Sequence, residues 1–232
     1  MTPGEFRLRV CFAKGGRLRW LSHLELVRAL ERVVRRAGLP YAVTAGFSPH
    51  MKIAFGHALP VGTEGEHEYF DLWLTSYVRP DEALAALSAA SPSDLEPSEA
   101  AYIGDRQPSL TAYLNVAVYR VVVGGEEELS VQSVDEALRT FVSAGELRIE
   151  RKGKKAKVFD LSRSLREEPR VSVAKDGIEI AMSVRVGPDG SLRPEWLVRS
   201  ALEQASIAVP RVHVTRVDTL VEVDGGVASR PM

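Results

Sequence analysis

Three side chains in the first 60 residues are of the types that cleave RNA without a metal ion. In such cleavage a base takes the 2′-hydroxyl proton, an acid protonates the leaving oxygen, and a cation stabilises the phosphorane. His23, His50 and Lys52 supply these types, and Tyr41 is a further proton donor. Each histidine also has a structural interpretation, His23 in the first turn of a helix and His50 in a turn. Spacing along the chain does not show whether these side chains meet in one site. The sequence therefore favours the structural roles and leaves a metal-independent endoribonuclease as an alternative.

Basic side chains are concentrated in two segments of a chain whose formal net charge is −1. Residues 1–60 carry ten Lys or Arg against three Asp or Glu, and residues 148–170 carry nine against four. The acidic segment 61–110 separates them. If the two basic segments share one face, they form a positive surface that attracts polyanions although the whole chain is nearly neutral. The side chains expected to contact phosphates are Arg17, Arg19, Arg28, Arg32, Arg35, Arg36, Lys52, Arg151, Lys152, Lys154 and Lys155. Phe47 and His50 are expected to shape the pocket beside them.

Composition excludes several classes of protein. With 45% hydrophobic and 26% charged residues, the chain is typical of a globular protein. It has no run of about 18 apolar residues, and charges are spread through its first 20 residues, so we expect a cytoplasmic protein without membrane contact. Its one cysteine, Cys11, cannot form an internal disulfide or hold an iron–sulfur cluster. The acidic loop around His57 and His67 lacks the close ligand pairs of zinc sites. We therefore expect no metal and no cofactor in this chain.

The elements that must position these residues follow a regular order in the first half. Residues 6–12 alternate between apolar and polar types, which predicts a strand. Ser22 and Glu25 form a capping box that begins a helix, and Gly38 with Pro40 ends it near Ala37. The remaining elements expected here are strands at 41–45, 52–58, 67–77 and 95–103 and a helix at 81–90. This β-α-β-β-α-β order, with the central hairpin elaborated around residues 46–50, is ferredoxin-like.

The same order of elements recurs in the second half. The expected strands are 112–123, 147–150, 158–161, 178–186 and 212–223, and the expected helices are 134–144, capped by Ser133, and 194–205. The basic loop 151–155 joins two of the strands. The sequence therefore predicts an α+β protein of two tandem ferredoxin-like units with antiparallel sheets, residues 1–107 and 108–232. The small, polar residues after Asp224 are expected to lie loose.

Several blocks of fixed spacing carry a resemblance to a known family. They are Leu21–Glu25, Arg28, Arg32–Pro40, Gly46–His50 and Ala58–Gly62. Together they resemble the radical-SAM-linked family of uncharacterised bacterial proteins, whose members are attached to, or encoded beside, a radical S-adenosylmethionine (SAM) protein. Their genes can also lie near one for an RNase E/G-type ribonuclease. The resemblance covers most of the first unit and extends to the basic loop near Arg151, and Met51 stands where the family pattern has proline. It implies a radical SAM protein as partner and identifies no reaction.

A weaker likeness, of fold alone, is to the CRISPR repeat-processing endoribonucleases, although their glycine-rich C-terminal loop is not evident here. From the charge pattern and the family resemblance, we expect a recognition component that binds structured RNA, tRNA or rRNA, for a radical SAM modification enzyme. The alternatives are the endoribonuclease, with His23, His50 and Lys52 as its catalytic residues, and an adaptor that binds only the radical SAM protein. Apart from that alternative, the sequence assigns no catalytic residue.

Overall fold

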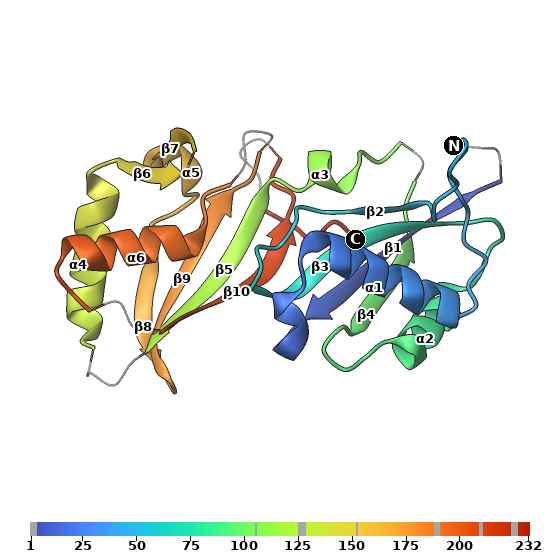
Figure 1. Cartoon of the computed structure of the whole chain (residues 1–232), viewed down its shortest axis with the longest axis horizontal. Coiled ribbons are helices and arrows are strands. Elements are labelled where there is room, and N and C mark those ends of the chain that lie inside the picture. Colours follow the sequence, from blue (N-terminus) through green and yellow to red (C-terminus); the bar gives the residue numbers. More distant parts are fainter. Residues whose placement is uncertain are drawn as a thin grey trace. The chain divides into compact units, whose positions relative to one another are not determined.

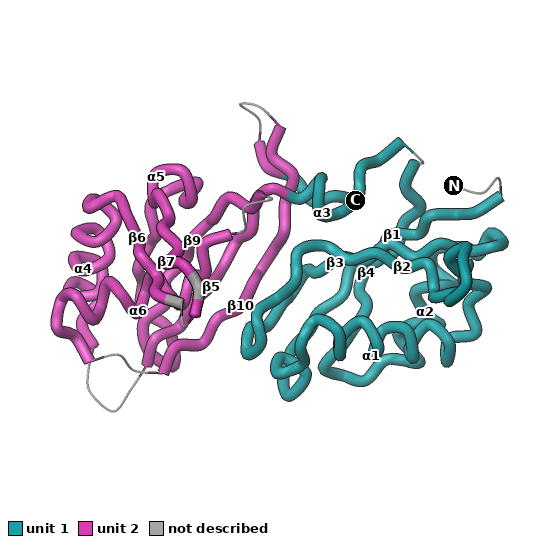
Figure 2. Tube along the Cα trace, turned by 45° about the horizontal axis from the view of Figure 1, so that its top comes forward, with its two compact units in different colours: residues 1–114, 229–232 teal, residues 115–228 magenta. Residues whose placement is uncertain are grey.

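The computed structural model of the chain describes residues 4–104, 106–124, 129–151, 153–187, 191–208, 211–223 and 227–232, with the backbone alone for residues 151 and 154. These residues form two compact units (Figure 2). Unit 1 comprises Met1–Leu114 and Ser229–Met232, and unit 2 comprises Asn115–Ala228. The division follows residue 114, whereas the predicted boundary follows residue 107. Four residues after unit 2 return to unit 1.

Unit 1 contains an antiparallel sheet with its two longest helices on one face (Figure 1). Its elements in chain order are β1 (Phe6–Lys14), the 3₁₀ helix η1 (Gly16–Trp20), α1 (His23–Arg36), β2 (Ile53–Phe55), β3 (Glu64–Leu74), α2 (Pro80–Ala90), β4 (Pro97–Tyr102) and α3 (Leu110–Tyr113). The strand order is β4-β1-β3-β2. Leu8, Val10 and Phe12 of β1 pack against Leu30 of α1 and Leu87 of α2 in the core.

The helix α1 begins and ends where the sequence predicts. The Glu25 N–H donates to Ser22 Oγ at 3.4 Å, and the Ser22 N–H donates to Glu25 Oε2 at 2.8 Å, which completes the capping box. The hydroxyl and amide of Ser22 lower the pKa of the Glu25 carboxyl from its ordinary value. Ala37 closes the helix, and Gly38 follows with a φ of 67°, a left-handed conformation that favours glycine.

Unit 2 has four antiparallel main strands and a separate hairpin. Its elements are β5 (Val116–Gly124), α4 (Val131–Ser143), β6 (Glu146–Arg151), β7 (Lys154–Asp160), α5 (Leu161–Ser164), β8 (Arg170–Ala174), β9 (Gly177–Arg185), α6 (Pro194–Gln204) and β10 (Arg211–Leu220). The order of the main strands is β10-β5-β9-β8, and β6 pairs only with β7. The chain is therefore an α+β protein with antiparallel sheets.

Several predicted elements differ from the structure. Residues 41–45 form isolated bridges, with Tyr41 opposite Leu74 and Val43 opposite Met51, instead of a strand. The predicted strand 112–123 begins only at Val116, after the short helix α3. Ser130 caps α4, because its Oγ accepts the Ser133 N–H at 3.4 Å, so the predicted cap was three residues late. The strand β8 was not predicted, and the two strands around the basic loop lie outside the main sheet.

The other face of the unit 1 sheet carries polar and aromatic side chains. In β1 and β3, successive side chains point to opposite faces, so this face holds Arg7, Arg9, Cys11, Tyr69, Asp71 and Trp73. Arg9, Cys11 and Asp71 are fully buried there. Among the described residues, no helix is long and apolar enough to cross a membrane.

Candidate nucleic-acid interface

The helix α1 presents one cationic face to solvent. Arg28, Arg32, Arg35 and Arg36 are all exposed, while the opposite side of the helix is buried in the core. Arg35 Nη2 lies 3.2 Å from Glu31 Oε2, one helical turn away. Arg32 and Arg36 form no ion pair with any described residue. Their guanidinium groups are therefore available to an anionic ligand.

The 3₁₀ helix η1 adds cations and an exposed aromatic ring. Arg17 is exposed, whereas Arg19 is half-buried and pairs with Glu64 at 3.2 Å. The Arg19 guanidinium carbon also lies 5.3 Å from the centre of the Trp20 ring. Trp20 is 60% exposed, and its ring lies against Gly62, where an added Cβ would be only 3.0 Å from a ring carbon. Trp20 therefore keeps most of its surface open to solvent.

Residues 43–50 form an exposed loop that contains two predicted site residues. The Thr44 N–H donates to the His50 carbonyl at 2.8 Å, and the His50 N–H donates to Thr44 Oγ1 at 3.1 Å, which closes the loop. Phe47 is fully exposed and His50 is exposed. Lys52 follows the loop, but its Nζ lies 2.6 Å from Glu5 Oε2 and 5.4 Å from the Trp73 ring centre. The charge of Lys52 is thus balanced by the carboxylate of Glu5.

The three residues of the alternative catalytic set have separate surroundings. His23 is exposed at the first turn of α1, and its ring meets Phe55 edge to face at 5.6 Å. His50 lies in the loop, and Lys52 contacts Glu5 and Trp73. Within the described part of the chain, no hydrogen bond or ion pair joins any two of His23, His50 and Lys52.

The predicted basic loop joins β6 to β7 in unit 2. Lys155 is exposed. Lys152 lies outside the described residues, and so do the side chains of Arg151 and Lys154. The described residues of this loop therefore lie on the separate hairpin.

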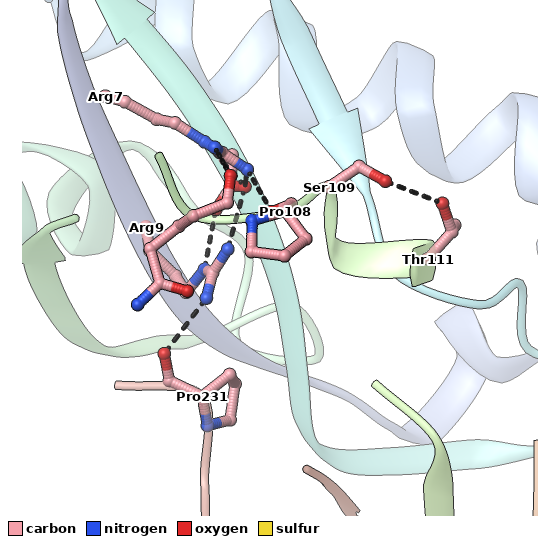
Figure 3. Close-up of polar contacts among 8 residues, drawn as sticks. Arg7, Arg9, Pro108, Ser109, Thr111 and Pro231 are labelled. Atoms are coloured by element: carbon pink, nitrogen blue, oxygen red, sulfur yellow. Dashed lines mark hydrogen bonds and ion pairs between the residues drawn. The ribbon is translucent and has the colours of Figure 1, made fainter. Parts of the chain in front are cut away.

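Sequence reasoning missed a buried charged cluster on the polar face of the unit 1 sheet (Figure 3). Arg9 binds Asp71 through two parallel contacts, from Nε to Oδ1 at 2.7 Å and from Nη2 to Oδ2 at 3.0 Å. Arg7 binds the same carboxylate, from Nη2 to Oδ2 at 2.6 Å and from Nε to Oδ2 at 3.1 Å. We call Arg7, Arg9 and Asp71 the arginine–aspartate triad.

The triad carries more positive than negative charge, because one carboxylate serves two guanidinium groups. The remaining donors reach neutral backbone carbonyls of two other segments. Arg7 donates to the carbonyls of Gln107 at 2.8 Å and Pro108 at 2.9 Å, and Arg9 Nη1 donates to the carbonyl of Pro231 at 2.9 Å. The residues after Asp224 were expected to be loose, but Pro231 is buried and accepts a hydrogen bond from Arg9. That expectation was wrong for residues 229–232.

Aromatic rings complete the surroundings of the triad. The Arg7 guanidinium carbon lies 5.2 Å from the Trp73 ring centre, and that of Arg9 lies 5.9 Å from the Tyr113 ring centre. Cys11 lies two residues beyond Arg9 on the same face, and burial raises the pKa of its thiol. The described residues contain no group of three or more His, Cys, Asp or Glu that could hold a metal ion.

The fold thus defines the chain as an α+β protein with an exposed cationic helix face. Comparison with protein families is more specific. Residues 7–194 match the model of a family described as an uncharacterized protein conserved in bacteria (DUF2344), and the chain belongs to this family. No curated protein matches it.

Two solved structures are similar over most of the chain. One chain of a Cbf5-Nop10-Gar1 complex is 10% identical, with 92% of this chain and 49% of that chain covered and a TM-score of 0.49. The present chain therefore spans about half the length of that protein. An unknown protein from Galdieria sulphuraria is 13% identical, with 94% and 99% covered and a TM-score of 0.28.

Proposed function

We propose that the chain binds structured RNA, of the tRNA or rRNA class, through the exposed cationic side of unit 1, and that it does so as the recognition component of a radical SAM modification enzyme. The observation that carries the proposal is the surface of α1. Arg32 and Arg36 are exposed, lie one turn apart and form no ion pair with any described residue, so an approaching phosphate need not displace a carboxylate. Phe47 and Trp20 offer exposed rings on which unpaired bases can stack.

We further infer that both units are ferredoxin-like. Counting only the strands of each main sheet, unit 1 has the order β4-β1-β3-β2, and unit 2 has β10-β5-β9-β8. In both, the fourth strand of the unit lies beside the first, the first beside the third, and the third beside the second. Each unit also has one long helix, α1 or α4, between its first and second strands and another, α2 or α6, between its third and fourth. On this interpretation the hairpin β6–β7, with its basic loop, is an insertion between α4 and β8.

The radical SAM partner rests on the family resemblance. A radical SAM enzyme needs a cluster held by thiolates, and this chain has one cysteine, which is buried. The partner would therefore supply the cluster and the chemistry, while this chain supplies the RNA contact. The untagged chain should be colourless, bind no iron and cleave no SAM when purified alone. Stoichiometric iron on the isolated chain would contradict this division of roles.

Fluorescence anisotropy with labelled tRNA tests the RNA contact. The variant Arg32→Gln/Arg36→Gln removes two unpaired cations from α1 and leaves Arg35 with its Glu31 partner. The control Arg163→Gln/Arg170→Gln makes the same charge change at exposed, ion-paired arginines of unit 2. Each lost phosphate contact reduces the log–log salt slope by about 0.7 to 0.9. We expect the α1 variant to bind more weakly with a shallower slope, and the control to resemble the wild type.

Equal affinity of the two double variants would refute the role of the α1 surface in RNA binding, and salt-independent binding would refute phosphate contact altogether.

The same preparations, incubated with tRNA and a chelator, test the endoribonuclease alternative. We expect intact RNA, because Lys52 is held by Glu5 and the histidines do not meet. Metal-independent cleavage that leaves a 2′,3′-cyclic phosphate and is lost in His23→Ala or His50→Ala would establish the nuclease instead. If the protein binds no RNA but binds the radical SAM protein, the adaptor is the correct alternative.

A further inference from the structure

A short segment covers the polar face of the unit 1 sheet. We call residues Ser229–Met232 the strap. Its Pro231 is buried and accepts the hydrogen bond from Arg9, as Figure 3 shows, while Ser229, Arg230 and Met232 are exposed. Arg230 lies 3.6 Å from Glu99 on β4, the residue directly opposite Cys11. The strap therefore lies over the same face that holds the triad.

Two contacts that Arg230 of the strap makes with described residues lie at the surface. The ion pair between Arg230 and Glu99 is about half exposed at both ends, 41% and 50%, so solvent screens it. The contact between Arg230 Nη2 and the His67 ring, at 3.0 Å to Nε2, also lies at the surface. The bond from Arg9 to Pro231 is buried, but its acceptor is a neutral carbonyl. A segment with these contacts can separate from the sheet without unfolding it.

The side chain beneath the strap is suited to a phosphate oxygen. Arg9 is fully buried, and its Nε and Nη2 are fixed by Asp71, so Nη1 is held in place. Among the described residues, the neutral Pro231 carbonyl accepts the hydrogen bond from this Nη1. A hydrogen bond from guanidinium to an anionic oxygen is roughly twice as strong as one to a neutral acceptor. Glu99, opposite Cys11 on this face, is half exposed.

We propose that the strap occupies an anion site, and that a phosphate group of the RNA backbone displaces it to bind Arg9, with Arg7 adding charge from behind. In the structure, the Pro231 carbonyl therefore occupies the position that a phosphate oxygen takes once the strap is displaced. This inference rests on the proposed RNA binding. It adds a second contact region on the sheet face, and it makes the strap a competitor of the RNA.

Hydrogen exchange of the strap tests the displacement directly. Wild-type protein is compared with and without saturating tRNA, and exchange is followed in the peptide that contains residues 227–232. Ordinary binding protects amides or leaves them unchanged, whereas displacement exposes those of the strap. We expect faster exchange in this peptide while α1 becomes protected. Unchanged or slower exchange of the strap, with α1 protected, would overturn the strap proposal and leave the proposed RNA binding intact.

Affinity measurements give an independent test. Deletion of residues 229–232 should raise RNA affinity about tenfold, the size expected from freeing one charge-assisted hydrogen bond. If the deleted protein folds poorly, Glu99→Gln loosens the strap at full length and should raise affinity about two- to threefold. Glu96→Gln is its matched control, because Glu96 is exposed nearby and the charge change is the same. Equal effects of Glu99→Gln and Glu96→Gln, with no gain on deletion, would contradict the competition.

A third arm separates this proposal from the function on which it rests. If neither wild-type nor strap-deleted protein binds RNA, the proposed RNA binding fails. Calorimetry with inorganic tripolyphosphate then decides the anion site alone. Tighter binding by the deleted protein than by the wild type supports the site, and equal or absent binding overturns it.

Discussion

Replacing Asp71 by asparagine should destabilise unit 1 more than any other single change within the triad. Both carboxylate oxygens accept bonds, Oδ1 from Arg9 and Oδ2 from Arg7 and Arg9. Asparagine keeps the size but turns one oxygen into an NH₂ donor, which must face a guanidinium donor. It also leaves two buried cations without a carboxylate. Removing one partner of a buried ion pair costs about 3 to 5 kcal/mol, and we expect Asp71→Asn to fall in that range.

Arg7→Met provides the internal comparison. It leaves the two parallel contacts between Arg9 and Asp71 intact and makes the pair neutral, so it should cost less than Asp71→Asn. Asp81→Asn, which breaks an exposed pair with Arg79, should change stability far less than either substitution in the triad.

Urea unfolding followed by tryptophan fluorescence measures these differences. The chain has three tryptophans, and a Trp196→Phe background confines the signal to Trp20 and Trp73 of unit 1. Coincidence with circular dichroism checks that the unit unfolds in one step. If Asp71→Asn were as stable as the wild type, or more stable than Arg7→Met, the reasoning from unpaired buried charge would be refuted.

Three further outcomes are expected. Ser22→Ala should lower the stability of unit 1 by about 1 kcal/mol in urea unfolding, because it removes the cap of α1; no change would show that the cap is redundant. Gly177→Ala should destabilise unit 2 and spare the unit 1 tryptophan signal, since φ is 140° and the added Cβ would collide with the Val123 carbonyl. Burial raises the pKa of Cys11, so its thiol ionises at lower pH in the unfolded chain than in the folded one. Its contribution to the free energy of unfolding is therefore fully present below the ordinary thiol pKa and declines as the pH rises above it. Alkylation of Cys11 at pH 8 should accordingly be much slower in folded than in urea-unfolded protein, and equal rates would contradict its burial.

Local signals explain what could be predicted from the sequence. The start of α1 depends on Ser22 and Glu25, three residues apart, and its end on Gly38, so the whole helix could be assigned within a residue. The strand β8 was missed although Val171 and Val173 alternate there with polar residues. The pattern covers only five positions, and none of the five residues is buried.

The triad could not be found by the same reasoning. Arg9 and Asp71 are 62 residues apart, and they meet because β1 and β3 pair in a register that places them directly opposite. The alternation in residues 6–12 did indicate that Arg7 and Arg9 share a face. It did not indicate that this face is covered, since the cover comes from residues 107–108 and 231. Burial of the polar face was therefore a tertiary property, whereas exposure of the α1 arginines followed from helical periodicity alone.

The contact between Arg9 and Pro231 also has a consequence for the order of folding. It joins residues 222 positions apart, and the entropic cost of closing a loop rises with its length. A ribosome makes about 5 to 20 residues per second, so the 118 residues after Leu114 take roughly 6 to 24 s to appear. During that time the nascent unit 1 can fold with its Arg9 guanidinium uncapped, close to ribosomal RNA. We expect the last hydrogen bond of unit 1 to form only after translation of unit 2.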